Sequence, residues 1–141
     1  MEARRILIVA NQTAGGEHLK EEVRRRIEEG PCTFKLLVPA APPYDHVWTE
    51  GECIAIATKR RDEGIAGLRE LGADIEGDIG DANPVQAIDD LLYGERFDEV
   101  ILSTLAPGAS RWLKQDLPHR VERRFKLPVT VITAAPDFTR V

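Results

Sequence analysis

The sequence is poor in cysteine and in aromatic residues. Only two cysteines, Cys32 and Cys53, occur among 141 residues, and aromatic side chains make up 6% of the chain. The two cysteines show no CxxC spacing, and no histidine accompanies them at the spacing of metal ligands. We therefore expect free thiols in a reducing compartment and no metal site.

The chain also lacks a long apolar segment and an excess of positive charge. No stretch has the length and apolar character needed to cross a bilayer. Residues 1–5 run directly into a strand pattern, without the apolar core and cleavage site of a secretory signal. The formal net charge of −5 opposes binding to duplex nucleic acid or to an anionic membrane surface. We expect a cytoplasmic protein with neither kind of partner.

What the sequence does contain is the composition of a soluble globular domain. Hydrophobic residues make up 43% of the chain and charged residues 30%. A chain of 141 residues is long enough for one hydrophobic core and short for two. We predict a single domain over residues 1–141.

Strand and helix patterns alternate along the chain. Short apolar runs rich in β-branched residues, such as Arg4–Ala10, predict strands buried in a parallel sheet. Apolar residues at helical spacing between start and stop signals, as in Glu17–Glu29, predict amphipathic helices. The predicted strands are 4–10, 34–38, 74–80, 99–102 and 128–133, and the predicted helices are 17–29, 49–72, 84–94 and a fourth through Leu113, Leu117, Val121 and Phe125.

This alternation predicts an α/β fold. We expect a five-stranded parallel sheet in the order 3-2-1-4-5 with helices on both faces, a flavodoxin-like, Rossmann-like three-layer sandwich. In this order the chain leaves the first and fourth strands toward opposite faces, and ligands bind in the crevice between them. Residues 11–16, 38–40 and 103–110 would face this crevice. The alternating acids of the third strand suit a sheet edge.

The loop after the fourth strand is the first candidate site. It runs from Ser103 to Ser110 through Pro107 and Gly108, and it leads into the fourth predicted helix. Such a loop presents backbone N–H groups and the positive end of the helix dipole at one spot, which favours anions. Pro118 falls inside the helix pattern, so we expect either a helix that starts at Asp116 as its cap or a kink.

The order of several short motifs resembles the universal stress protein family of adenine-nucleotide-binding-like α/β domains. The resemblance covers nearly all of Arg4–Thr133 and rests on Arg5–Val9, Gly80–Pro84 with Ile88, Phe97–Ile101, Gly108–Arg111, His119–Val121 and Leu127–Ile132. It implies the same sheet order and a homodimer in which the last strand, Pro128–Thr133, pairs across a twofold axis. The family has members that bind ATP and members that do not.

The sequence departs from the signature of the ATP-binding members, Gly-x2-Gly-x9-Gly-Ser/Thr with an Asp after the first strand. Leu102, Leu105 and Gln115 stand in place of the glycines, Asp116 in place of the hydroxyl, and Asn11 in place of the Asp. A leucine would fill space that a phosphate needs. At about 4 Å and an effective dielectric constant of about 20, the repulsion between Asp116 and a phosphate is about 4 kcal/mol. The resemblance thus implies that ATP binding is lost or weak.

Two hypotheses for the function remain open. The first is a dimeric module that acts by interaction with an unknown protein partner and needs no cofactor. The alternative is a nucleotide-binding switch that holds ATP in the crevice. The candidate binding residues are Asn11, Thr13, Val38, Ser103, Thr104, Gly108, Ser110 and Arg111.

An enzyme is the least supported class, since the sequence shows no recognisable nucleophile and base. Ser103 or Ser110 with His119 would need a contact that only the fold can provide. The basic stretch from His119 to Arg124 either meets an acidic partner or forms a solvated helix face, and the glutamate within it favours the solvated face.

Overall fold

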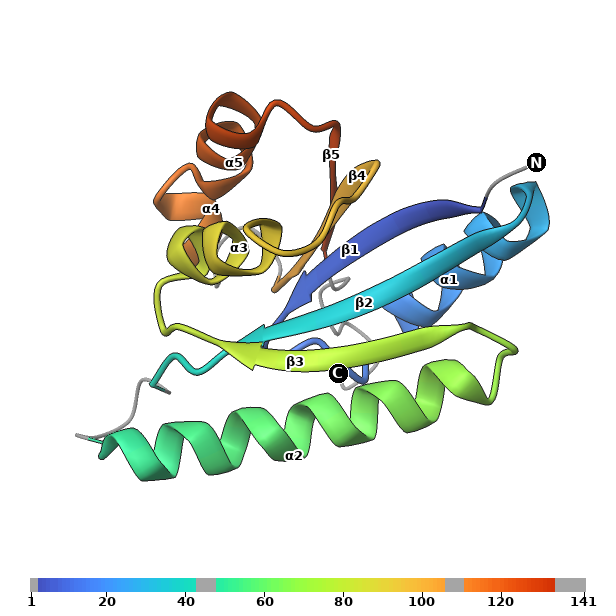
Figure 1. The fold of residues 1–141 in the computed structure, drawn as a ribbon. Helices are drawn as coiled ribbons and strands as arrows, with labels where there is room; N and C mark the ends of the chain where they lie inside the picture. Colours follow the sequence, from blue (N-terminus) through green and yellow to red (C-terminus); the bar gives the residue numbers. More distant parts are fainter. Residues whose placement is uncertain (1–2, 43–47, 106–110, 134–141) are drawn as a thin grey trace, which may run out of the picture.

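The computed structural model describes residues 3–42, 48–105 and 111–133. These residues form a five-stranded parallel sheet in the order β3-β2-β1-β4-β5, with helices on both faces (Figure 1). The strands are β1 (Arg4–Ala10), β2 (Cys32–Pro39), β3 (Ile75–Gly80), β4 (Glu99–Thr104) and β5 (Val129–Thr133). The helices are α1 (Glu17–Glu29), α2 (Glu50–Arg69), α3 (Pro84–Leu92), α4 (Arg111–Lys114) and α5 (Leu117–Phe125). The predicted sheet order is confirmed, with β3 at an edge as expected.

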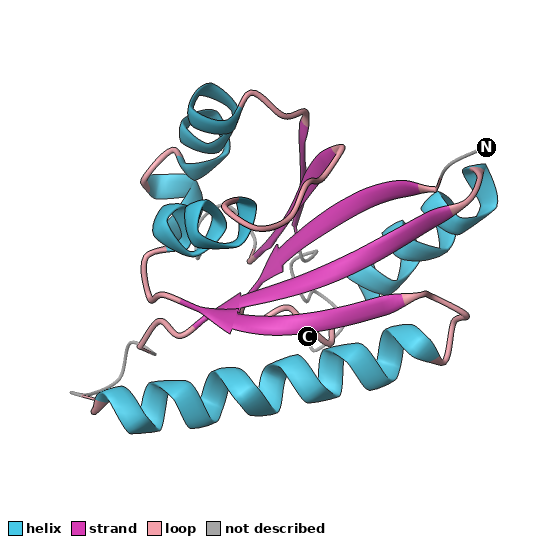
Figure 2. Cartoon of the chain, in the orientation of Figure 1, coloured by secondary structure: helices cyan, strands magenta, loops and turns pink. Residues whose placement is uncertain are grey.

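The central strand β1 separates two hydrophobic cores, one on each face of the sheet. Ile8 is aligned with Leu36 of β2 and Ile101 of β4, and all three side chains are fully buried. These residues pack with α1 and α2 on one face, while Leu7 and Val9 pack with α3 and α5 on the other (Figure 2). Because successive side chains of β1 point to opposite faces of the sheet and both faces are covered by helices, β1 is apolar on both faces.

The starts of α2 and α3 follow their sequence signals. The Thr49 hydroxyl accepts a hydrogen bond from the Glu52 N–H at 3.1 Å. Asn83 Oδ1 accepts from the Val85 N–H at 2.9 Å, and Pro84 occupies the first turn of α3. Both side chains satisfy donors that a helix N-terminus otherwise leaves unpaired, so Thr49 and Asn83 act as side-chain caps of α2 and α3.

The fourth predicted helix is two helices, α4 and α5, with a break between them. Asp116 lies in the break with a left-handed backbone, φ 56° and ψ 38°, and its side chain accepts no backbone hydrogen bond from α5. The carboxylate instead accepts from His119 Nδ1 at 2.7 Å. Pro118 falls in the first turn of α5, where it costs little. The helix therefore starts at Asp116 as its N-cap residue, as the first alternative predicted, although the Asp116 side chain makes no capping hydrogen bond.

A buried ionic cluster joins α1 to the amino-terminal ends of the strands. Glu99 of β4 is 5% exposed and accepts hydrogen bonds from Arg26 and Arg4. Arg26 is 8% exposed and also donates to Glu22 at 2.7 Å. Two buried charges in an apolar setting are stable only while they are paired, so α1 depends on Glu99 for its docking.

Helix α2 approaches the β1–α1 loop closely at Gly64. A Cβ atom at this position would lie 3.0 Å from the carbonyl oxygen of Ala14 and 2.9 Å from Leu36 Cδ2. Gly67, one turn further along the same helix, would meet only the flexible end of Lys20, at 3.2 Å. Gly64 thus sets the distance between α2 and the loop that leads to the candidate site.

Candidate functional site

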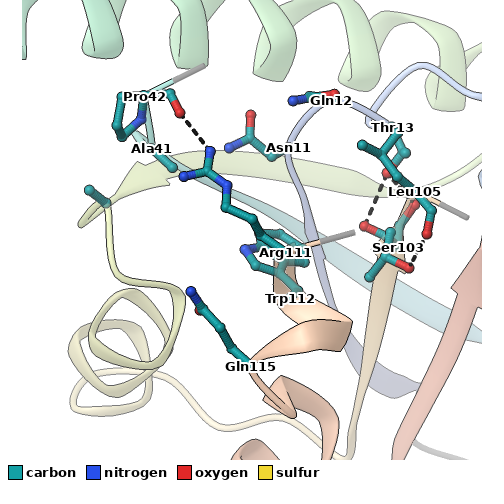
Figure 3. A pocket seen from close by; sticks show the side chains of 12 residues that line it. Asn11, Gln12, Thr13, Ala41, Pro42, Ser103, Leu105, Arg111, Trp112 and Gln115 are labelled. Carbon is teal, nitrogen blue, oxygen red and sulfur yellow. Dashed lines mark hydrogen bonds between the residues drawn. The ribbon is translucent and has the colours of Figure 1, made fainter. Parts of the chain in front are cut away.

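A pocket of about 180 Å³ opens at the carboxyl-terminal ends of β1 and β4, where the strand order reverses (Figure 3). The β1–α1 loop, the end of β2, the end of β4 and helix α4 surround it. The lining residues are Asn11, Gln12, Thr13, Ala41, Pro42, Ala82, Ser103, Thr104, Leu105, Arg111, Trp112 and Gln115. The pocket therefore lies in the crevice that the predicted fold assigns to ligands.

Asn11 is fixed in place on one side of the pocket. Its Nδ2 donates to the Pro39 carbonyl at 3.3 Å, and its Oδ1 accepts a hydrogen bond from Arg60 of α2. Burial lowers the pKa of the Arg60 guanidinium. An arginine still carries its charge at neutral pH, so Arg60 adds positive potential behind Asn11.

Three polar side chains meet at the base of the pocket. Ser103 Oγ lies 2.6 Å from Thr13 Oγ1 and 3.0 Å from His18 Nε2, and the Thr13 hydroxyl is also 3.0 Å from the Ser103 carbonyl oxygen. Burial lowers the pKa of His18, and the negative charge of Glu21 opposes this shift only in part. His18 is therefore a neutral imidazole at neutral pH, with Nε2 held against the serine hydroxyl.

The opposite wall of the pocket is cationic and partly apolar. Arg111 Nη2 donates to the Pro42 carbonyl at 2.7 Å, which holds the guanidinium across the opening (Figure 3). Trp112 supplies apolar surface beside it, whereas Leu105 lies near Thr13 and Ser103. Among the described lining residues Arg111 carries the only formal charge, and no carboxylate lines the pocket. The electrostatics of this site favour an anionic ligand although the chain as a whole is acidic.

Five of the eight predicted binding residues line this pocket: Asn11, Thr13, Ser103, Thr104 and Arg111. Two others, Gly108 and Ser110, lie outside the described residues. The assignment of Val38 is wrong. Its side chain is fully buried in the core beneath α2, because alternation along β2 directs it into the sheet face. The chain reaches the pocket only beyond β2, at Ala41 and Pro42.

Of the four residues that stand in place of the glycines and the hydroxyl of the ATP signature, two line the pocket and two do not. Leu105 and Gln115 line the pocket. Leu102 instead packs in the core on the face covered by α3 and α5, fully buried and one residue before the serine that faces the site. Asp116 is exposed and bonded to His119, and it does not line the pocket. The carboxylate of Asp116 is thus turned toward His119 rather than toward the described pocket lining.

Sequence reasoning missed three residues that shape the site, Trp112, Arg60 and His18, and it placed Gln12 at the crevice without naming it as a binding residue. Gln12 and Trp112 are direct neighbours of predicted residues, so the loop positions alone could have indicated them. Arg60 and His18 reach the site from α2 and α1, and their contacts depend on how these helices dock. No local pattern in the sequence marks them.

These features define a flavodoxin-like α/β fold with an anion-favouring pocket at its switch point. A solved universal stress protein in complex with cAMP aligns with 95% of this chain and 100% of its own, at 18% identity and a TM-score of 0.59. A universal stress protein from Archaeoglobus fulgidus aligns with 94% of this chain and 95% of its own, at 14% identity and a TM-score of 0.63. The chain matches no protein-family model and no curated protein. It has the fold of the universal stress proteins, as the resemblance in its sequence predicted.

Two features are absent from the described part of the chain. Across the described ranges, no three histidine, cysteine or acidic side chains come together as a group that could hold a metal ion. In the same part of the chain, every helix is too short or too polar to span a bilayer.

We expect His18 to make folding stability depend on pH just below its ordinary pKa of 6.5. Because burial lowers the folded-state pKa, the unfolded chain binds the proton more tightly, and the free energy of unfolding rises with pH between the folded value and 6.5. Urea titrations on both sides of this window should show the rise in the unchanged protein and lose it in His18→Gln. The exposed His119 provides the control, and an equal loss in His119→Gln would contradict this assignment.

Proposed function

We propose that this chain is a divergent member of the universal stress protein family, and that its pocket binds a nucleotide with a single phosphate group in preference to ATP. The observation that carries this proposal is the pocket at the ends of β1 and β4, with one arginine and no carboxylate among its described lining residues. A neighbour of the same fold is a universal stress protein in complex with cAMP.

The size and chemistry of the pocket support a small anionic ligand. Pockets for drug-sized molecules measure about 300–1,000 Å³, whereas this one measures about 180 Å³. Arg111 supplies a charged donor for one phosphate, and the hydroxyls of Ser103 and Thr104 supply further polar contacts. Trp112 offers a flat apolar surface for a base. A triphosphate with its magnesium ion needs more room and an acidic ligand that the described lining does not provide.

Calorimetric titration with AMP, cAMP and magnesium ATP tests this proposal. We expect AMP or cAMP to bind more tightly than ATP. Arg111→Gln should weaken AMP binding by about 10- to 100-fold, because a hydrogen bond to a charged group contributes about 1.5–3 kcal/mol. Asp116→Asn is the matched control and should leave the affinity unchanged, since Asp116 lies outside the pocket. ATP binding tighter than AMP, or a loss of affinity in the control, would overturn the proposal.

A second proposed property is a homodimer formed through β5. This strand lies at a sheet edge and pairs only with β4 among the described strands. Val131 at its centre is 37% exposed, a large fraction for a valine in a sheet. An edge of this kind can pair with a second copy across a twofold axis. In such a dimer β5 connects the pocket at the end of β4 to the dimer interface. Ligand binding in the pocket would thereby change how the dimer interacts with a partner protein in the cytoplasm.

Sedimentation at low micromolar concentration tests the dimer. We expect a dimer for the unchanged protein and a monomer for Val131→Lys, because a charge at the paired edge would be desolvated. Tyr93→Lys is the control, since Tyr93 is 96% exposed at the C-terminal end of α3 and its replacement should leave the dimer intact. A monomer in the unchanged protein would remove the strand-pairing proposal and leave the ligand proposal standing.

A further inference from the structure

The serine at the base of the pocket has a histidine partner that the sequence did not reveal. Ser103 Oγ lies 3.0 Å from His18 Nε2, within hydrogen-bond reach. Ser103 does not pair with His119, the partner that the sequence left open, because His119 of α5 bonds to Asp116 in the break before that helix. Ser103 is 1% exposed to bulk water but lines the pocket, so a group that reaches its hydroxyl has already left the solvent.

We propose that Ser103 is a nucleophile, that His18 is its general base, and that this pair transfers acyl groups from small carboxylic esters that enter the pocket. This activity goes beyond nucleotide binding and requires no bound nucleotide. The geometry matches the general arrangement of an activated serine, in which a neutral imidazole nitrogen receives the hydroxyl proton.

Thr13 and His18 together can direct the proton of the Ser103 hydroxyl. The single hydroxyl proton of Thr13 has two acceptors within reach, the Ser103 carbonyl oxygen at 3.0 Å and Ser103 Oγ at 2.6 Å. In the arrangement in which Thr13 donates to Ser103 Oγ, the Ser103 proton points to His18 Nε2. The same Thr13 donor then stabilises negative charge on Ser103 Oγ once the proton has moved. Burial keeps His18 neutral at neutral pH, so Nε2 is free to accept. Thr13 is thus a positioning residue for the nucleophile.

The start of α1 supplies electrostatic support. Helix α1 has 13 residues and begins after Gly16. Because glycine has no side chain, the N-cap residue accepts no hydrogen bond from the N–H groups of the first turn through a side chain. His18 lies in this first turn and contacts Ser103, so the positive end of the helix dipole lies beside the reacting oxygen. Arg111 adds a full positive charge on the other wall. Both would stabilise the anionic oxygen that develops on the ester carbonyl.

Gly16 permits this arrangement. A Cβ atom at Gly16 would lie 2.8 Å from His18 Cε1 and 2.9 Å from His18 Nδ1, closer than side-chain atoms can pack. The backbone of Gly16 has φ −76°, which alanine adopts without strain. Alanine at this position would therefore displace the imidazole ring, and its Cβ would also lie 3.3 Å from the Thr13 carbonyl oxygen, a tight contact. Gly15, whose added Cβ would meet nothing within 4 Å, offers a matched control.

The proposed reaction balances without any further reagent. Ser103 Oγ forms a bond to the ester carbonyl carbon while its proton passes to His18 Nε2. The tetrahedral intermediate breaks the bond to the ester oxygen, and the leaving alcohol takes the proton from His18. Acyl-Ser103 and a free alcohol result, and water then releases the carboxylic acid by the same steps, with His18 as base toward water.

Acetylation by p-nitrophenyl acetate tests the proposal. We expect release of nitrophenol with the gain of one acetyl group in the intact mass, and peptide mapping should locate that group on Ser103. Ser103→Ala should abolish this label, whereas Ser103→Cys should retain it and show that the site still folds. His18→Gln should lower the labelling rate by about 100-fold, the smallest effect usual for a general base. His119→Gln should not change it.

Two further measurements distinguish a general base at His18 from a histidine that has only a structural role. The labelling rate should rise with pH below the ordinary His18 pKa of 6.5 and then level off, because only neutral imidazole accepts a proton. Gly16→Ala should lower the rate about 10-fold or more by moving the ring, and Gly15→Ala should leave it unchanged. An acetyl group found only on lysines or the N-terminus, or equal rates in His18→Gln and the unchanged protein, would overturn the proposal. The nucleotide titrations above are independent of either result.

Discussion

Replacing Glu99 by alanine is expected to lower the free energy of unfolding by about 3 kcal/mol. Glu99 is the buried partner of both Arg26 and Arg4, and its removal leaves the guanidinium of Arg26, 8% exposed, without its closest carboxylate. Glu22 stays within 2.7 Å of Arg26, which keeps the loss near the lower end of the range for broken buried pairs. Urea unfolding of the purified variant measures the change.

Glu29→Ala is the matched control for this experiment. Glu29 pairs with Arg25, and both side chains are about half exposed, at 52% and 54%. Exposed pairs of this kind contribute less than about 1 kcal/mol. If Glu99→Ala and Glu29→Ala lost similar amounts of stability, the buried cluster would not have the role assigned to it.

Gly64→Ala is expected to lower the free energy of unfolding by about 1–3 kcal/mol, the usual cost of an extra methyl group in a packed interior. The new Cβ would press on the carbonyl oxygen of Ala14, a backbone atom that cannot rotate away. Since Ala14 belongs to the loop that carries Asn11 and Thr13, we also expect weaker AMP binding. Chemical unfolding and calorimetry measure the two effects.

Gly67→Ala should act in the opposite direction. It lies in the same helix, and its Cβ would meet only the flexible Lys20 side chain. Alanine is favoured over glycine in a helix interior by about 1 kcal/mol, so this variant should gain stability. From the sequence alone both glycines weaken the helix, unless close packing requires them. Equal responses of the two variants would contradict the close approach at Gly64.

The fold could be predicted from sequence because its determinants are local. Buried apolar runs mark β1 and β2, helical periodicity marks α1, and Asn83 with Pro84 marks the start of α3. The break between α4 and α5 was harder to predict. An Asp two residues before a proline is typical of a helix cap, but the left-handed backbone of Asp116 turns its carboxylate toward His119 instead.

The candidate site could be predicted only in part, because some of its contacts arise from packing. Residues at the ends of β1 and β4 follow from the sheet order, and four of them were identified together with Arg111 at the start of α4. The direction of Leu102 could have been inferred, since side chains alternate in a strand and Ser103 faces the opposite side. The contact of His18 with Ser103 joins residues far apart in sequence and depends on the position at which α1 docks.

The two edges of the sheet differ in a way that bears on how the protein behaves in concentrated solution. On β3, the carboxylates of Glu76 and Asp78 gather around Lys35, and such charges discourage a further strand from adding. The sequence of β5, Val129–Thr133, is uncharged and largely β-branched, which makes it a template for strand addition. When no other chain covers the edge formed by β5, we expect fibrillar aggregation to begin at this strand. A single lysine substituted into β5 should therefore slow aggregation of the stored protein.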